Sequence, residues 1–172
     1  MENIRKNGGA GLMVEKLTLA QVREMLAVIE ELKHFPASIK FTYALARNRA
    51  RLAPAVGAWE QACFPRPPYQ EYDARRVEVC REFCLKDEGG APRIEGQQFI
   101  MDPARREEFE AAMAELRREY AEALTDREAQ LREAEALLEE PADVELYRLP
   151  LEHFPDGLTL VQMNGLMPMV AE

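Results

Sequence analysis

Apolar residues recur at helical spacing through most of the chain, which predicts a mainly α fold. The first periodic segment begins at Thr18. Thr18 and Gln21 form the pattern of a capping box, in which each side chain satisfies a backbone N–H of the first helical turn. Pro36 ends this helix, because the residue before a proline is disfavoured in the α region. The stripe predicted to face a core consists of Val22, Met25, Leu26, Ile29 and Leu32.

Two further helices are predicted next, separated by prolines. The second runs from about Ser38 to Cys63, and Pro54 inside it predicts a kink or a break because proline has no N–H to donate. Its buried side consists of Phe41, Leu45, Leu52, Val56 and Trp59. Residues 65–68 predict an extended linker, and a third helix covers about 69–85. The inward positions of that helix are Tyr72, Val79, Cys80 and Phe83.

Turn-forming residues then interrupt the helical pattern. Asp87-Glu88-Gly89-Gly90 is a strong turn signal, and Gly96 separates short apolar runs on either side of it. Residues 91–101 are therefore predicted to form a small β-hairpin or ribbon.

A long charged helix is predicted after the ribbon. Asp102 and Pro103 supply a cap followed by proline at the first helical position, and Pro141 ends the helix after Glu140. Unbroken, it would span roughly 57 Å at 1.5 Å per residue. A break near Thr125 is the alternative, because a second capping-box pattern begins there. The apolar seam consists of Phe109, Met113, Leu116, Tyr120, Leu131 and Leu138.

The C-terminal segment combines a predicted strand with a short helix. The strand is indicated by alternating apolar residues, which are Val144, Leu146 and Leu149. Thr159 and Gln162 repeat the capping-box pattern, and Gly165 and Pro168 close the helix. A tail this apolar is expected to be buried, on its own domain or on a neighbouring subunit. Its apolar residues are Met163, Leu166, Met167, Met169 and Val170.

The length of 172 residues suits one domain with a real core. Residues 1–12 are polar and Gly-rich, which predicts a flexible tail rather than a secretory signal, followed by a single helical domain over residues 13–172. No run of about 18 apolar residues occurs, so no membrane segment is expected. The expected fold is an antiparallel helical bundle with one long charged helix and a small β-hairpin or ribbon, in a cytoplasmic protein.

Charge is divided unevenly along the chain, whose net charge is −9. Residues 1–60 carry 9 basic and 6 acidic side chains, whereas residues 61–172 carry 13 basic and 25 acidic ones. Nucleic acid is not expected as a partner, because neutralising phosphates requires a positive field.

Residue types typical of catalysis or metal binding are scarce. Cys63, Cys80 and Cys84 are interpreted as small buried residues in a reducing compartment, since only His34 and His153 are available to complete a metal site. Phosphate-binding glycine loops and nucleophile motifs are absent from the sequence, and no pair of carboxylates stands out for acid–base work. The sequence therefore predicts a protein that is not an enzyme and needs no cofactor.

The strongest functional signal is a stretch without acidic residues, Leu32 to Trp59. Spacings of seven and four place Lys40, Arg47 and Arg51 on one helical face, near Tyr43. Guanidinium groups bind phosphate or carboxylate, and an aromatic ring can stack on a ligand. The candidate ligand-binding residues are Lys40, Tyr43, Arg47 and Arg51.

A competing interpretation is that this basic helix packs beside the acidic long helix and balances its charge. The two interpretations differ in one respect. If Arg47 and Arg51 each meet a glutamate of the same chain, the ligand interpretation loses its support.

The order of the parts resembles small uncharacterised proteins of tailed bacteriophages. The resemblance covers about Leu17 to Met169 and rests on the basic second helix, the Asp87-Glu88-Gly89-Gly90-Ala91-Pro92 turn, the charged helix and a Leu-Thr-x-x-Gln tail. It implies a phage or prophage origin and an accessory role, and it supplies no functional residues.

The expected function is a non-enzymatic accessory or interaction protein. It would act through its long acidic helix or apolar tail, with a protein partner or as a homo-oligomer. The alternative is an anti-defence protein that sequesters a host nucleotide or other phosphorylated small ligand around Lys40, Arg47 and Arg51.

Overall fold

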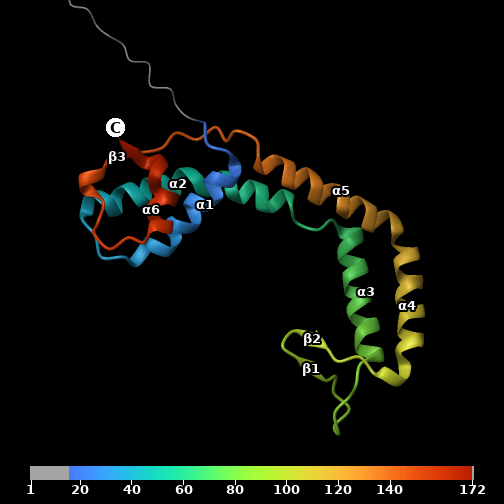
Figure 1. Cartoon of the computed structure of the whole chain (residues 1–172). Helices are drawn as coiled ribbons and strands as arrows, with labels where there is room; N and C mark the ends of the chain where they lie inside the picture. The colour runs from blue at the N-terminus through green and yellow to red at the C-terminus, as the bar shows by residue number, and fades with distance from the viewer. Residues whose placement is uncertain (1–15, 172) are drawn as a thin grey trace, which may run out of the picture. The chain divides into compact units, whose positions relative to one another are not determined.

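The computed structural model describes residues 16–171 and is mainly helical with a small antiparallel two-stranded sheet, which confirms the predicted fold class (Figure 1). The chain divides into two compact units. Unit 1 comprises Met1–Ala58 and Leu137–Glu172, and unit 2 comprises Trp59–Ala136. The predicted tail, residues 1–12, lies outside the described residues, and the single domain over residues 13–172 stays a prediction. No helix in the described part is long and apolar enough to cross a membrane.

Helix α1, Leu19–Glu31, opens unit 1 and begins at the predicted capping box. The Thr18 N–H donates to Gln21 Oε1 at 2.9 Å, and the Gln21 N–H donates to Thr18 Oγ1 at 3.3 Å. A 3-10 turn, Leu32–His34, extends the helix to the predicted stop. Most of its predicted stripe is buried in the core of unit 1, namely Val22, Met25, Ile29 and Leu32, with Leu26 partly buried against them.

Helix α2, Ile39–Ala62, continues through Pro54, so the break that proline predicts is absent. Leu52 and Val56, two residues to either side of Pro54, are buried. Their packing stabilises helical backbone on both sides, and tertiary packing of this kind outweighs the loss of one hydrogen bond.

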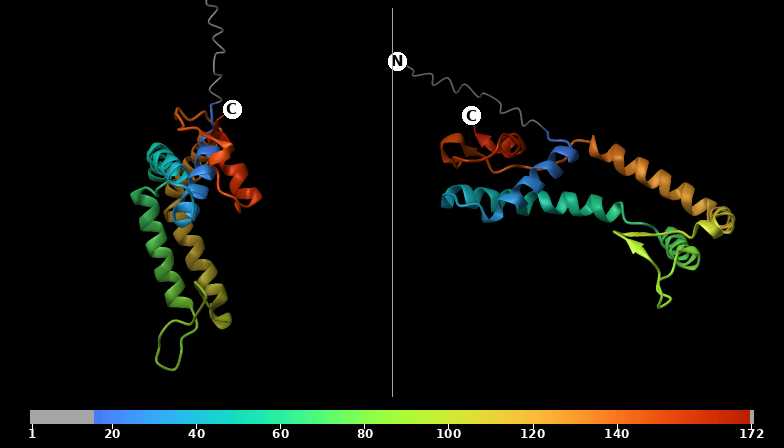
Figure 2. Two further views of the ribbon diagram at one scale, coloured as in Figure 1. Left: turned by 90° about the vertical axis from the view of Figure 1, so that its left-hand side faces the viewer. Right: turned by 60° about the horizontal axis from the view of Figure 1, so that its bottom comes forward.

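Helix α6, Leu160–Leu166, packs against α1 (Figure 2) and begins at the second predicted capping box, formed by Thr159 and Gln162. It is followed by the 3-10 turn Met167–Met169. Leu166 and Met169 are fully buried, so unit 1 itself covers this part of the apolar tail.

The strand predicted from Val144 is much shorter than expected. Strand β3 consists of Leu149–Pro150 alone, pairs in parallel with β4, Val170–Ala171, and precedes the 3-10 turn Leu151–His153. Val144 and Leu146 pack against the core of unit 1 without joining a strand. Their alternation reflects this packing, which a sequence pattern does not distinguish from strand pairing.

Unit 2 contains helix α3, Pro67–Phe83, beside helix α4, Arg106–Glu119 (Figures 1 and 2). The predicted linker is therefore shorter than expected, because Pro67 and Pro68 form the first turn of α3, where proline has no N–H to lose. Tyr72, Met113 and Leu116 form the buried core between the two helices. Val79, Phe109 and Tyr120 pack against this core, and Cys80 is partly buried.

The prediction of one long helix is wrong, and so is a break near Thr125. Helix α4 ends at Tyr120, whose φ and ψ are −103° and 25°, and α5 follows as Ala121–Leu138. Thr125 lies inside α5, where its hydroxyl donates to the Ala121 carbonyl. The apolar seam also ends earlier than predicted, since Leu131 is 47% exposed. The buried residues of α5 are Ala123, Gln130 and Ala134.

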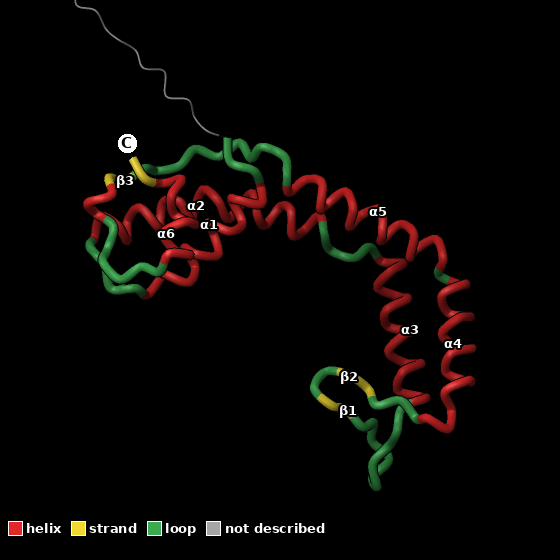
Figure 3. The backbone as a smooth tube through the Cα atoms, viewed as in Figure 1, coloured by secondary structure: helices red, strands yellow, loops and turns green. Residues whose placement is uncertain are grey.

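The predicted ribbon is a hairpin of two short strands, β1, Ile94–Glu95, and β2, Gln98–Phe99 (Figure 3). Gly96 adopts a φ of +63° in the connecting turn, a conformation that glycine adopts without steric cost. The hairpin prediction is confirmed.

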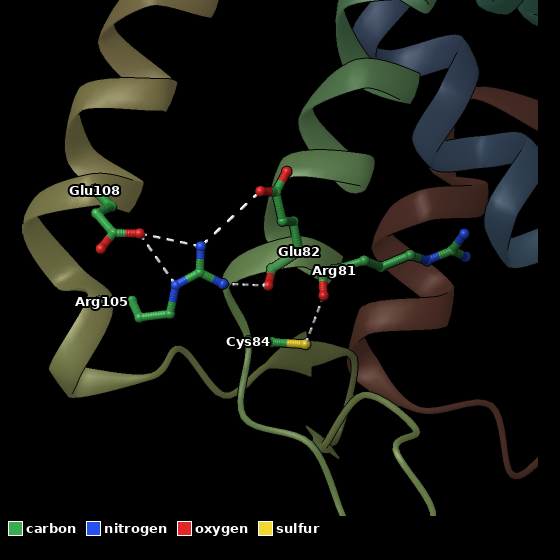
Figure 4. Close-up of polar contacts among 5 residues, drawn as sticks. All are labelled: Arg81, Glu82, Cys84, Arg105 and Glu108. Carbon is green, nitrogen blue, oxygen red and sulfur yellow. Dashed lines mark hydrogen bonds and ion pairs between the residues drawn. The ribbon is translucent and has the colours of Figure 1, made fainter.

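The Arg105 side chain links the start of α4 to the end of α3 through polar contacts (Figure 4). Its guanidinium donates to Glu108 Oε2 at 3.1 and 3.2 Å and to the Glu82 carbonyl at 3.0 Å, and it lies 4.2 Å from the centre of the Phe83 ring. Nearby, the buried Cys84 thiol donates to the Arg81 carbonyl at 3.2 Å. Every one of these contacts is internal to the unit, which favours a structural role for this corner.

Tyr120 should make unit 2 sensitive to alkaline pH. Its hydroxyl donates to Glu71 Oε1 at 3.0 Å, and this hydrogen bond, followed by partial burial and the nearby negative charge, raises the pKa of Tyr120 above its ordinary value. The folded state therefore holds this proton more tightly than the unfolded state. The stability it contributes is complete below the ordinary tyrosine pKa and is lost as the pH rises through the folded pKa.

Above about pH 10, the urea midpoint of the wild type should fall more steeply with pH than that of Tyr120→Phe. The variant has no phenol proton at this position, while every other tyrosine is retained as an internal control. Equal declines in the two proteins would show that Tyr120 contributes nothing to the pH dependence.

Candidate functional site

The four predicted ligand-binding residues lie in one row along α2. Lys40, Tyr43 and Arg47 are exposed and Arg51 is partly buried. Their first and last members are eleven residues apart, which corresponds to roughly 16 Å of helix. The helical spacing inferred from the sequence therefore does place these side chains on a common face.

Arg47 lies beside two tyrosine rings. Its Nη1 donates to the Tyr43 hydroxyl at 3.1 Å, and its guanidinium carbon is 5.8 Å from the centre of the Tyr43 ring and 5.4 Å from that of Tyr147. The two rings meet edge to face, with their centres 5.7 Å apart. Such a cation–π arrangement restricts the guanidinium while leaving it exposed.

Asn48 positions Tyr147. The Asn48 side chain is fully buried, its Nδ2 donates to the Tyr147 carbonyl at 2.9 Å, and its Oδ1 accepts from the Tyr147 N–H at 2.7 Å. Nδ2 also lies 3.6 Å from Met169 Sδ. A single side chain thus satisfies both backbone groups of Tyr147 and holds its ring next to Arg47.

Asn48 as a positioning residue and Tyr147 as a site residue were not predicted from the sequence. One signal was available, because Asn48 follows Phe41 by seven residues and precedes Leu52 by four, which places a polar side chain on the buried stripe. Buried polar groups are almost always hydrogen-bonded. The partner, however, is 99 residues away along the chain and has no local pattern.

Lys40 meets a histidine rather than a carboxylate. Its Nζ lies 3.1 Å from His153 Nε2, and this ring nitrogen is 3.6 Å from a Glu152 carboxylate oxygen. Phe154 packs edge to face on Phe41 at 5.3 Å, which anchors this segment on α2. We call Lys40, Tyr43, Arg47, Arg51 and Tyr147 the basic–aromatic face.

The contacts of the three arginines distinguish the two interpretations of the basic helix. Arg49 forms an ion pair with Glu30. Arg51 Nη1 donates to the backbone carbonyl of Glu145 at 2.8 Å, and neither Arg51 nor Arg47 meets a carboxylate among residues 16–171. Internal charge balance therefore accounts for Arg49 alone, and the assignment of the other cations to a binding site stays a prediction.

A second polar cluster lies in unit 2 and has a structural explanation. Gln130 Nε2 donates to the Ala62 and Phe64 carbonyls at 2.6 and 2.9 Å, and Arg127 donates to the Cys63 carbonyl at 2.7 Å. These bonds satisfy carbonyls that the end of α2 would leave unpaired. A small pocket beside them is lined by Arg66, Pro68, Tyr69, Ala123, Asp126, Arg127 and Gln130.

In the described part of the chain, no three His, Cys, Asp or Glu residues are grouped so that they could hold a metal ion. The three cysteines are free thiols, Cys84 buried and the other two partly buried.

No protein-family model, no curated protein and no solved structure matches this chain, and the resemblance to phage proteins stays a prediction.

Proposed function

We propose that this chain is a non-enzymatic interaction protein whose binding surface is the basic–aromatic face and whose partner presents acidic side chains. The observation that supports this proposal is the pair of exposed cations, Lys40 and Arg47, that meet no carboxylate among the described residues. Exposed cations beside tyrosine rings favour an anionic partner with some apolar surface.

The openness of the face favours a protein partner over a small ligand. Tyr43 is 51% exposed, and Lys40 and Arg47 are also exposed. Small-molecule sites are usually concave and bury most of the ligand, whereas arginine and tyrosine are enriched at the energetic centres of protein interfaces.

The face is also held in place before any partner arrives. Arg47 is restricted by the Tyr43 and Tyr147 rings, and Asn48 fixes the backbone of Tyr147 from the core side. Association loses free energy when it must order side chains at the interface, and prior ordering reduces this loss. Arg47 should therefore contribute more to binding than a free surface arginine does.

Binding of fluorescein-labelled poly-L-glutamate, followed by fluorescence anisotropy, tests the proposed function. The wild type should bind at low salt, and Arg47→Ala should weaken binding about 5- to 30-fold, as expected for an interface arginine worth about 1–2 kcal/mol. Added salt should weaken the wild-type interaction as well.

Arg117→Ala is the matched control, because Arg117 is an exposed arginine of α4 with no ion pair among the described residues. It removes the same charge from the whole protein. Equal losses in the two variants would mean that only net charge matters, and the proposed function would be wrong.

A phosphorylated small ligand is the second candidate, and the anti-defence role would follow from it. It is favoured by the guanidinium of Arg47 lying beside two rings, an arrangement suited to a phosphate next to a base or a sugar. A thermal-shift screen with cyclic and ADP-ribose-type nucleotides separates the candidates, since a ligand at 100 times its Kd should stabilise by about 2.7 kcal/mol. Nucleotide stabilisation that Arg47→Ala abolishes, without poly-L-glutamate binding, would replace the first proposal with the second.

A further inference from the structure

Helix α5 presents an acidic outer face within unit 2. Glu128 and Glu135 are exposed, and Leu131 between them is 47% exposed. The buried residues of α5, Ala123, Gln130 and Ala134, lie on an adjacent side of the helix, roughly 110° around its axis. This outer face therefore combines carboxylates with an apolar side chain that unit 2 leaves about half exposed.

The spacing of this acidic face matches that of the basic–aromatic face. Glu128, Leu131 and Glu135 are three and four residues apart, as are Lys40, Tyr43 and Arg47. Two parallel helices aligned in this register would place Lys40 near Glu128, Tyr43 near Leu131, and Arg47 near Glu135. This register therefore pairs two cations with two carboxylates and brings one tyrosine ring against one leucine side chain.

Neither set of charges forms an ion pair with an opposite charge within the described chain. Lys40 and Arg47 meet no carboxylate, and Glu128 and Glu135 form no ion pair with any residue between 16 and 171. Surface charges that are not neutralised by an opposite charge of the same chain remain available to a complementary surface on another molecule.

We propose that the acidic partner of the basic–aromatic face is a second copy of this chain, which binds through the Glu128–Leu131–Glu135 face of its α5. This inference rests on the proposed function and names its partner. It predicts reversible self-association that weakens as salt is added, because the matched charges are exposed.

Arg132 provides a test in the opposite direction. It lies between Glu128 and Glu135 in the sequence, is exposed, and forms no ion pair among the described residues. In the proposed register its positive charge faces a basic surface, so Arg132→Ala should tighten self-association. If Arg132 instead only contributed packing contacts to the interface, Arg132→Ala would weaken self-association.

Charge reversal, followed by sedimentation equilibrium of the full chain, tests the pairing. Arg47→Glu and Glu135→Arg should each weaken self-association at least about tenfold, since each places like charges together. The double variant, Arg47→Glu with Glu135→Arg, should regain association. An equimolar mixture of the two single variants should also associate, because one chain keeps an intact basic face and the other an intact acidic face.

A monomeric wild type at the highest attainable concentration would overturn the inference, and so would a double variant that stays dissociated. These outcomes do not affect the proposed function if Arg47→Ala still loses poly-L-glutamate binding. Conversely, an Arg47→Ala variant that binds poly-L-glutamate like the wild type overturns the proposed function. Unchanged far-UV circular dichroism of the exposed-site variants excludes unfolding as the cause of dissociation.

Discussion

Replacing Asn48 with alanine is expected to lower the free energy of unfolding by about 2–4 kcal/mol. Asn48 is fully buried and forms hydrogen bonds with both the N–H and the carbonyl of Tyr147. Alanine leaves these two backbone groups without their partner and opens space beside Met169. Urea unfolding followed by circular dichroism measures the change.

Asn164→Ala is the matched control, because Asn164 is an exposed asparagine of α6. It should change stability by less than about 0.5 kcal/mol. Asn48→Ala should also weaken poly-L-glutamate binding under conditions in which the variant remains folded, since Tyr147 loses its anchor beside Arg47. A folded variant with both stability and binding unchanged would contradict the positioning role of Asn48.

Gly165→Ala is expected to destabilise the protein by about 1–2 kcal/mol, although alanine is the better helix former. Gly165 lies in α6 where that helix packs on α1, and a Cβ at this position would be 2.7 Å from Val28 Cγ2. Val28 is β-branched and has little freedom to rotate within a helix. The steric cost should therefore exceed the gain in helix propensity, which urea unfolding can measure.

Gly57→Ala is the same substitution where nothing lies within 4 Å of the added carbon. It falls within α2 and should stabilise by about 0.5–1 kcal/mol. The double variant Gly165→Ala with Val28→Ala should recover part of the loss, because the clash is relieved. If Gly165→Ala and Gly57→Ala stabilise equally, close packing between α1 and α6 is not what selects glycine at position 165.

The secondary structure could be predicted best where local signals determine it. Both capping boxes are formed, at Thr18 and at Thr159, since capping depends on residues only three apart. The hairpin around Gly96 follows from turn chemistry in the same way. Capping boxes and turn residues act over a few neighbouring positions, so a short stretch of sequence contains all the information needed to predict them.

The break at Tyr120 depends on tertiary contacts and could not be predicted from local pattern. The sequence around it favours an uninterrupted helix, and the nearby capping pattern at Thr125 is not used. Tyr120 instead packs on Tyr72, with ring centres 5.9 Å apart, and hydrogen-bonds Glu71. Both partners come from α3, so the position of the break reflects the pairing of helices rather than the capping pattern.

The candidate site also has one part that local sequence predicts and one part that depends on tertiary contacts. Lys40, Tyr43, Arg47 and Arg51 share one helix, so their common face follows from spacing alone. Tyr147 and His153 join them from a distant segment through Asn48 and Lys40. Among residues 16–171, no carboxylate lies beside Arg47 or Arg51. Sequence spacing could not predict this, and it favours a binding surface over internal charge balance.

The most direct test of the central claim is phenylglyoxal footprinting of arginines with and without saturating poly-L-glutamate, read by mass spectrometry. If the basic–aromatic face binds an acidic partner, the peptide should slow modification of Arg47 at least about fivefold and leave Arg117 unchanged, since only groups covered by the peptide are shielded. Arg47 that stays as reactive as before, or protection shared equally by Arg47 and Arg117, would contradict the claim.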